Sequence, residues 1–300
     1  MTRYSAVTLD LSRFPPPLAI AGVDEEAILA ARIGRLKGLL NELGVPYDVD
    51  RIEHDPVAAL QQSDTVREAG VLSAVNDAVR AVMVAFATGA DLDHLGLFYG
   101  IARRIIGQGG DGSAILEGDD EFRRQVLLAP EAFSTAGTHG GYVFWALRAD
   151  GRVLNADVWS PAPREVTIAV QSRLDDGLAS ADLVEAVRAQ LTRKDIKPLT
   201  DEVNVRSVTN HTYSVSLDAF VLPGPDALAV KSAIEAAIMR EAAARRTPAR
   251  DMPRSALIAA AQLAVVDRVA LVSPMNDIAR DYGEVPVLTG LDVRVQTYAG

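Results

Sequence analysis

The chain has 300 residues, of which 49% are hydrophobic and none is cysteine, and its formal net charge at pH 7 is -10. This length and hydrophobic content allow a substantial core and one to three domains, while the lack of cysteine excludes disulfides, thiolate zinc sites and cysteine nucleophiles. The negative charge disfavours a nucleic-acid-binding surface, because such a surface has to neutralise phosphates.

The chain is expected to begin with an irregular arm, residues 1–23, in which Pro15-Pro16-Pro17 forms a stiff extended stretch. Asp24 is a suitable N-cap for the helix that follows, and Gly44 with Pro46 ends it, so the first helix is predicted over residues 25–43. A second long helix is predicted between residues 64 and 88.

Both helices carry a narrow apolar seam, in which apolar residues recur alternately every three and four positions. The seam consists of Leu29, Ile33, Leu36, Leu40 and Leu43 in the first helix and Leu72, Val75, Val79, Val82 and Phe86 in the second. Such spacing is typical of a helix that packs against another helix. The two seams can meet within one chain, as a helical hairpin, or meet partner chains. Both arrangements fit so few heptads, and our prediction is that the bundle is intermolecular.

Gly89 is expected to end the second helix in the left-handed conformation, and Asp91 to cap a short helix that carries Leu92, Leu95 and Phe98. A glycine-rich surface loop is expected over residues 106–118. Helices are then predicted over residues 119–128 and 141–147.

Beyond residue 150 the apolar pattern changes to the period of two that is typical of strands. Strands are predicted at 153–159, 165–171, 203–208, 213–222, 265–272 and 291–296, and helices at 181–191, 226–245 and 255–263. The first four strands are expected to form a sheet with helices on one face. Ser160-Pro161 and Ser273-Pro274 follow similar strands, which suggests two related α/β modules. The predicted fold class is α+β, with long bundle-forming helices followed by two small α/β modules that contain mixed or antiparallel sheets.

No local pattern indicates catalysis, a cofactor or a metal site. Residues 107–112 match G-x-G-x-x-G, but a dinucleotide site needs a strand before this motif and a helix opening at its end, whereas helical residues are expected before it here. The four histidines, His54, His94, His139 and His211, lie far apart, and no G-x-S-x-G motif positions a serine nucleophile. We therefore expect no catalytic, cofactor-binding or metal-binding residues and no small-molecule substrate.

Three spaced motifs carry a family resemblance. The first runs from Thr88 to Leu95 and continues through Phe98, Tyr99, Gly100 and Arg103; the second is Asp119 to Arg124; the third is Ser134 to Gly137, followed by Tyr142 and Ala146. Lys197 to Asp201 and Leu222 to Pro225 extend the similarity, which covers roughly residues 58–272. In this order and spacing, the motifs resemble those of the baseplate J-like family, the wedge components of contractile phage tails.

The resemblance implies a structural protein of the virion, located in the tail baseplate and assembled in the cytoplasm of the bacterial host. A second copy of the chain and a smaller wedge protein of the tail-protein I type would be its partners in a wedge. Wedges would form a ring around the tail hub, through contacts with sheath-initiator and hub proteins, and rearrangement of the ring would trigger sheath contraction. Nucleic acid is not an expected partner, and no membrane span is expected because no run of about 18 apolar residues occurs.

By the same resemblance, the motif residues have structural roles. These residues are Gly89, Asp91, Leu92, Asp93, Leu95, Tyr99, Gly100 and Arg103 around the first corner and Phe122, Arg123, Arg124, Gly137 and Tyr142 around the next. Arg123 and Arg124 are expected to form local ion pairs with Asp119 and Asp120. The expected domains are an arm (1–23), a bundle-forming region (24–100), a central α+β domain (101–222) and a C-terminal α+β module (223–300).

Two other classes of function remain open at this point. An enzyme with a dispersed active site would contain a deep pocket with carboxylates of perturbed pKa. A helical adaptor unrelated to phage would differ in being monomeric on its own and in lacking tail proteins as partners.

Overall fold

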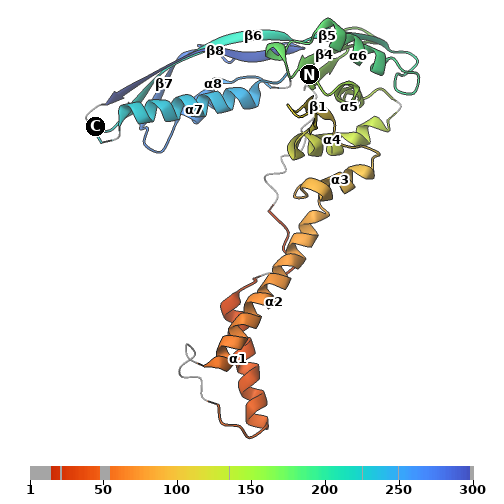
Figure 1. Ribbon diagram of the computed structural model, residues 1–300. Coiled ribbons are helices and arrows are strands. Elements are labelled where there is room, and N and C mark those ends of the chain that lie inside the picture. The colour runs from red at the N-terminus through yellow and green to blue at the C-terminus, as the bar shows by residue number, and fades with distance from the viewer. Residues whose placement is uncertain are drawn as a thin grey trace. The chain divides into compact units, whose positions relative to one another are not determined.

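The computed structural model describes residues 15–20, 22–47, 55–134, 136–224, 226–248 and 250–297. The chain divides into two compact units, whose boundary in the sequence lies between Ala102 and Arg103. The first unit is helical and the second contains two small mixed sheets with their helices (Figure 1). The fold is therefore α+β, as the sequence predicts.

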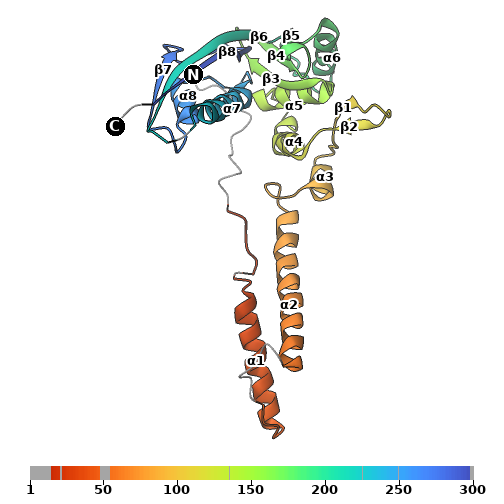
Figure 2. The same cartoon turned by 60° about the vertical axis from the view of Figure 1, so that its left-hand side comes forward.

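The first unit is built from a helical hairpin and a short third helix. Its helices are α1 (Glu25–Glu42), α2 (Pro56–Ala81) and α3 (Gly89–Leu97). The Asp24 side chain caps α1 by accepting hydrogen bonds from the backbone of Glu26 and Ala27 at 2.9 and 3.3 Å, as predicted. Views from two directions show α1 and α2 lying side by side (Figures 1 and 2).

Helix α2 begins and ends earlier than the sequence predicts. Asp55 caps it by accepting a 2.8 Å hydrogen bond from the Val57 N–H, and Pro56 occupies the first turn, where a missing N–H costs nothing. The helix ends at Ala81, and the backbone N–H of Phe86 donates to Met83 in the turn that follows. The prediction of a helix over residues 64–88 was wrong at both ends, and Phe86 lies outside α2.

Gly89 has a positive φ of 52°, which confirms the left-handed conformation predicted for it. It opens α3, however, and does not close α2, and the N-cap is Thr88. Asp91 is thus in the first turn of α3 and is not its N-cap, which corrects the prediction. A carboxylate in the first turn still interacts favourably with the positive end of the helix dipole.

The second unit starts with a β-hairpin and two helices. These are β1 (Ile105–Gln108), β2 (Ala114–Leu116), α4 (Asp119–Ala132) and α5 (His139–Ala149). The predicted irregular loop over residues 106–118 is therefore wrong, because β1 and β2 pair antiparallel across a turn in which Gly112 has a φ of 82°. The sequence misleads here because each strand is too short to show a period of two.

The first three-stranded sheet has the order β3-β4-β5. Its strands are β3 (Val153–Trp159), β4 (Glu165–Ser172) and β5 (Glu202–Ser207), and the chain between β4 and β5 contains a 3-10 turn (Asp175–Gly177) and α6 (Ala181–Leu191). Strand β4 pairs antiparallel with β3 and parallel with β5. Six consecutive residues of β4 are buried, so both faces of this central strand are covered.

The second sheet has the order β7-β6-β8. Its strands are β6 (Thr209–Val221), β7 (Arg268–Ser273) and β8 (Glu284–Thr297), and its helices are α7 (Ala227–Arg245) and α8 (Arg254–Ala261). Helix α7 runs along one face of the long strands β6 and β8 (Figures 1 and 2). The expectation that residues 213–222 share a sheet with the three preceding strands was wrong, since β6 is the centre of this second sheet.

The Ser-Pro similarity does not extend to strand pairing. Strands β3 and β4, which flank Ser160-Pro161, pair with each other, whereas β7 and β8, which flank Ser273-Pro274, lie on opposite sides of β6. The two modules share mixed sheets of three strands but not the repeat that the sequence suggests.

The two sheets are joined by a dense junction. Trp159 of β3 stacks on Tyr282, with ring centroids 5.4 Å apart, and the Arg206 guanidinium lies 5.0 Å from the centre of the Trp159 ring. The Gly283 N–H donates to Asp157 Oδ2 at 2.9 Å. A Cβ on Gly283 would lie 2.9 Å from the Ala169 Cβ, so this glycine lets the two modules approach closely.

A buried ion pair fastens the β1–β2 hairpin to the helices of the same unit. Arg104 Nε donates to Glu117 Oε2 at 2.8 Å, and both side chains are almost fully buried. Arg104 also donates to the carbonyl oxygens of Leu147 and Val153, and Gln125 donates to the Glu117 carboxylate. Every charge in this cluster is thus paired and hydrogen-bonded, as burial requires.

Two buried tyrosines differ in their hydrogen bonding. The Tyr142 hydroxyl donates to Asp201 Oδ2 at 2.7 Å, whereas the Tyr213 hydroxyl has no hydrogen-bond partner among the described residues. Burial raises the pKa of Tyr213 to about 12, with a smaller contribution from the charge of Glu241. Burial, and then the hydrogen bond to Asp201, raise the pKa of Tyr142 as well.

Replacing Glu117 with Gln is expected to lower the free energy of unfolding by about 3 kcal/mol, because the buried Arg104 cation loses its closest countercharge. Urea denaturation of the full chain measures this. Glu185→Gln is the matched control: its pair with Arg188 is exposed, so a loss of no more than about 0.5 kcal/mol is expected. Equal losses in the two variants would contradict a structural role for the buried pair.

The free energy of unfolding is expected to fall as the pH rises above about 10, the pKa of an unfolded tyrosine, toward the raised pKa of the folded state. Folding favours the protonated phenol in this window. Tyr213→Phe removes one such group and a hydroxyl without a hydrogen-bond partner. It should therefore reduce the loss of stability at alkaline pH and leave the free energy of unfolding at pH 7 unchanged or higher.

Tyr142→Phe should lower the free energy of unfolding at pH 7 by about 1 to 2 kcal/mol, because the hydrogen bond to Asp201 is lost. Urea titrations at neutral and alkaline pH separate the two; a large loss at pH 7 in Tyr213→Phe would count against this reasoning.

Candidate partner-binding surface

The two helices of the hairpin meet through small and polar side chains. The buried residues of α2 are Ala58, Thr65, Ala69 and Asn76, and α1 has no buried residue at all. The buried positions of α2 follow a seven, four and seven spacing, so α2 does present a heptad-like face to α1, but not the apolar face predicted. The hairpin therefore buries little apolar area.

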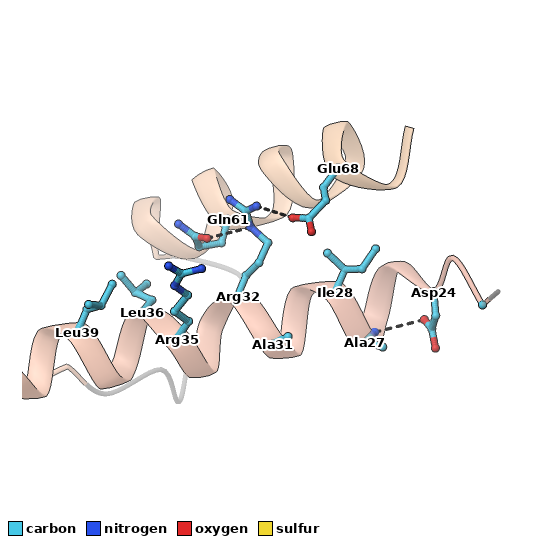
Figure 3. Close-up of a pocket in the computed structure, with 11 residues that line it drawn as sticks. Asp24, Ala27, Ile28, Ala31, Arg32, Arg35, Leu36, Leu39, Gln61 and Glu68 are labelled. Atoms are coloured by element: carbon cyan, nitrogen blue, oxygen red, sulfur yellow. Dashed lines mark hydrogen bonds and ion pairs between the residues drawn. The ribbon is translucent and has the colours of Figure 1, made fainter. Parts of the chain in front are cut away.

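An arginine of α1 holds α2 through three side chains. Arg32 Nε donates to Gln61 at 3.1 Å, and its two terminal nitrogens lie 2.8 Å from Asp64 and 2.7 Å from Glu68. The three partners are three and four residues apart and so share one face of α2. Figure 3 shows the Arg32 side chain reaching across from α1 to Gln61 and Glu68. These contacts orient α2 along the face that α1 offers.

The segment before α1 is held along α2 by a buried asparagine. The Ile20 N–H donates to Asn76 Oδ1 at 3.0 Å, and Asn76 Nδ2 donates to the Ile20 carbonyl oxygen at 3.1 Å. Tyr47, after α1, donates to Asp55, the N-cap of α2, at 2.6 Å. Residues early in this region thus contact residues late in α2, which shows that the helices are antiparallel.

None of the ten predicted seam residues is buried. Leu29, Ile33, Leu36 and Leu40 of α1 are half-buried, as are Leu72, Val79 and Phe86. Leu43 is 75% exposed, Val82 69% and Val75 40%. Five further large apolar residues of the same two helices are exposed: Leu39, Val57, Leu60, Val66 and Val71. Those five lie outside the predicted seams, so a search for heptad spacing does not find them.

A groove of about 630 Å³ runs along the hairpin (Figure 3). Apolar side chains of α1 line it, including Ile28, Leu36 and Leu39, together with Arg32 and Arg35. Gln61 and Glu68 of α2 close its other side. The lining of the groove combines apolar side chains with four charged ones, those of Asp24, Arg32, Arg35 and Glu68, and such a mixed lining suits the side of an amphipathic helix.

The motif residues of the second unit meet across motifs. Arg103 of the first motif forms a 2.6 Å ion pair with Asp119 of the second, and its guanidinium lies 5.1 Å from the centre of the Phe122 ring. Arg123 pairs with Asp120 at 2.7 Å, as predicted. Arg124 reaches beyond its own helix and donates to Asn155 of β3 at 2.5 Å, a contact that the sequence does not predict.

The third motif meets the Lys197–Asp201 segment. Gly137 has a φ of 69°, and a Cβ there would lie 2.8 Å from the Pro198 ring and 2.9 Å from Asp201, so only glycine fits. Tyr142 reaches the same Asp201 carboxylate, and Lys197 donates to the Asp201 carbonyl oxygen at 2.6 Å. Two segments far apart in the chain thus form one corner, with Tyr142 and Asp201 separated by 59 positions.

The remaining motif residues lie around α3 in the first unit. Leu92 is fully buried, Leu95 and Tyr99 are half-buried, and Asp93 is exposed. Gly100 has a φ of 66°, so it turns the chain after α3 in a conformation that suits glycine.

The glycine-rich motif at residues 107–112 forms the end of β1 and the hairpin turn. A strand precedes it, where helical residues were expected, and a strand follows it, so the helix N-terminus that would face a pyrophosphate is missing from this position. Across the described part of the chain, no group of three or more His, Cys, Asp or Glu side chains is arranged to hold a metal ion. No described helix is both long and apolar enough to cross a membrane.

Comparison with known proteins gives matches over most of the chain. Residues 53–110 match the baseplate J-like N-terminal domain, and residues 134–207 match the baseplate J-like central domain. Baseplate protein J of Escherichia phage P2 is 35% identical over 278 residues, which cover 90% of this chain and 92% of the relative. The chain belongs to the baseplate J-like family. The resemblance inferred from the motifs is confirmed, and this membership supports a structural role in a phage baseplate.

The baseplate J-like matches fall on particular elements. The N-terminal domain match includes α2, α3 and β1, and the central domain match includes the whole of the first three-stranded sheet. The second sheet lies outside both family matches, although the similarity to the phage P2 protein covers nearly the whole chain.

Arg32→Gln is expected to loosen the hairpin, because the shorter neutral side chain cannot reach Gln61, Asp64 and Glu68 together. Each pair is partly exposed, so a total loss of about 1 to 2 kcal/mol is expected. Amide hydrogen exchange in α1 and α2 reports the change. Lys37→Gln, on an exposed position of the same helix, should leave exchange unaltered. Equal exchange rates in Arg32→Gln and the unaltered chain would show that the three contacts do not hold the hairpin.

Proposed function

We propose that this protein is a wedge component of the baseplate of a contractile phage tail. Two copies assemble with a smaller wedge protein of the tail-protein I type, and several such wedges form a ring around the tail hub. Sheath-initiator and hub proteins are its further partners. Rearrangement of the ring on host contact lets the sheath contract, so the protein acts through its surfaces and performs no catalytic step.

The observation that carries this proposal is the incompletely covered hairpin. Family membership supports a baseplate role, and the ten seam residues, all left at least partly open, supply a surface for partner helices. Exposed apolar side chains gathered along one element mark interaction sites in soluble proteins. Burial of one leucine side chain contributes about 1.5 to 3 kcal/mol, so partner helices that cover several of these residues gain a stable interface.

The proposed division of labour follows the chain. Residues 24–100 form the bundle with partner chains, after an arm of residues 1–23, most of which lies outside the described residues. Residues 101–222 and 223–300 are the central domain and the C-terminal module, and the second of these joins neighbouring wedges. Assembly takes place in the host cytoplasm, and the finished virion carries the protein in its tail baseplate.

Replacing Leu36 and Leu40 with Asp is expected to abolish wedge formation, because two charges enter the apolar surface that partner helices cover. Co-expression with the I-type wedge protein, followed by co-purification, measures assembly. Lys37→Asp is the matched control: it makes the same total change of charge, at an exposed position of the same helix, and should preserve assembly.

A second variant guards against simple unfolding of the hairpin. Val75→Asp with Val82→Asp changes two exposed seam residues and should also prevent co-purification, while circular dichroism shows the helices intact. Full co-purification of either leucine or valine variant would contradict the proposed bundle, whereas loss of helix signal in both would assign the effect to folding.

A further inference from the structure

Strand β8 forms one edge of the second sheet. It has 14 residues and pairs with β6 from Glu284 to Thr297, and no strand among the described residues pairs with its other side. The outer edge of such a strand offers backbone N–H and C=O groups to another strand. Soluble proteins usually protect such an edge against pairing with other chains, and the two halves of β8 differ in this respect.

The first half of β8 is protected. Pro286 has no N–H to donate, and Thr289 is an extra residue that interrupts the register with β6 between Leu288 and Gly290. A bulge of this kind bends an edge strand and terminates pairing. The second half, from Gly290 to Thr297, contains no proline, no lysine and no register shift. The protective features are thus confined to one half of the strand.

The open half alternates cleanly between two faces. Leu291, Val293 and Val295 belong to the core between the sheet and its helices, and Val293 is fully buried while its two neighbours are only half-buried. Asp292, Arg294 and Gln296 are on the other face and are exposed. The apolar core of this module therefore extends to the edge of β8 and is incompletely covered there.

This half of β8 is complementary to a second copy of itself. In an antiparallel pair related by a two-fold axis at Val293, Asp292 of each copy stands directly opposite Arg294 of the other. Leu291 then faces Val295, and Val293 faces Val293. Opposite charges and apolar pairs directly across two strands stabilise a sheet, so both faces of the pairing are matched. A shift by one residue in the axis would lose both charge pairs.

Asp292 and Arg294 have contacts within their own sheet but remain exposed to solvent. The Asp292 side chain is 63% exposed and the Arg294 side chain 52%, and they lie 3.9 Å apart on the same face. Arg294 is kept extended over this face by its 2.9 Å contact with Asp218 of β6. Asp292 accepts a 3.4 Å hydrogen bond from the hydroxyl of Ser216, which also belongs to β6. Both side chains are thus oriented by β6 and remain open toward the edge.

We propose that the open edge of β8 pairs antiparallel with β8 of a second copy of this chain, about a two-fold axis at Val293, to give one continuous six-stranded sheet. The pairing deepens the proposed function, on which it rests for the identity of the second copy as one from a neighbouring wedge. The hairpin takes no part in it, so the two contacts can fail separately.

A charge-exchange series of full-length chains tests the pairing. Asp292→Arg and Arg294→Asp each place like charges opposite each other twice in the dimer, so the dissociation constant of each variant alone should rise about tenfold or more. A mixture of the two variants restores both opposite-charge pairs and should dimerise as the unaltered chain does. The double variant with both exchanges should do the same. Sedimentation equilibrium measures all four samples.

Glu185→Arg is the control for Asp292→Arg. It makes the same change of charge at an exposed position of α6 and should leave dimerisation unaltered. Thermal unfolding of each variant checks that the fold is intact, because Arg294→Asp also loses the contact with Asp218. An unaltered chain that stays monomeric at every concentration, or a mixture that associates no better than its components, would overturn the proposal.

Cysteine cross-linking gives a second readout, which benefits from the lack of cysteine in the native sequence. A mixture of Asp292→Cys and Arg294→Cys chains should form a disulfide-linked heterodimer on mild oxidation, since directly opposite residues are close enough to cross-link. Neither chain alone should do so. A homodimer of Asp292→Cys alone would mean either parallel pairing or an antiparallel pair with its axis at Asp292, and a cross-link between Asp292→Cys and Gln296→Cys would mean an axis at Arg294; each of these results overturns the stated geometry.

The two proposals are told apart by combining these variants with the seam variants. Leu36→Asp with Leu40→Asp should leave the 292–294 cross-link unaltered, and Asp292→Arg should leave co-purification with the I-type protein unaltered. A loss of the cross-link in the seam variant would mean that β8 pairing depends on the hairpin and would overturn the claim that β8 pairs on its own. If the seam variants co-purify normally while the cross-link forms, the proposed bundle fails and the strand pairing stands.

Discussion

The contact between α1 and α2 is the constraint on which the first unit depends, because it leaves the apolar side chains of both helices incompletely covered. The buried residues of α2, among them Ala58, Thr65 and Ala69, are small or polar, Arg32 joins α1 to α2, and α1 has no buried residue. Isolated helices gain little stability from propensity alone, so most of it has to come from tertiary packing. The packing that this hairpin lacks is therefore its most informative feature, because it points outward to other chains.

The second unit is organised in the opposite way. It contains a buried ion pair whose charges are satisfied, that of Arg104 and Glu117, and a corner that accepts only glycine, at Gly137 against Pro198. Arg103 of the first motif contacts Asp119 and Phe122 of the second, and the third motif forms the corner at Gly137. We infer that the buried contacts around the motifs hold the helices and strands of this unit in fixed positions, as a protein that acts through its surface requires.

The sequence predicts much of this architecture where a signal is local. Asp24 caps the first helix as expected, and the helices α4, α5, α6 and α7 lie close to their predicted positions. It fails where the deciding contact is distant. Nothing near Asn76 indicates that it holds Ile20, nothing near Arg124 indicates Asn155, and the division of the strands between two sheets depends on pairings far apart in the chain. Heptad spacing is a local signal, so the sequence alone suggests an apolar seam, but whether that seam binds a partner helix depends on contacts that the spacing does not show, and the seam stays a prediction.

The connection between the two sheets is a single residue, Val208, which separates β5 from β6. It is buried, and its N–H donates to the Val170 carbonyl oxygen at 3.0 Å, so its backbone angles are not free to change. A hinge needs a few residues whose backbone angles can change, and only Val208 lies between the two strands. The short connection and the contacts of Trp159 with Tyr282 therefore favour a fixed relative orientation of the two sheets, and we expect them to move together when a force acts on the end of β8.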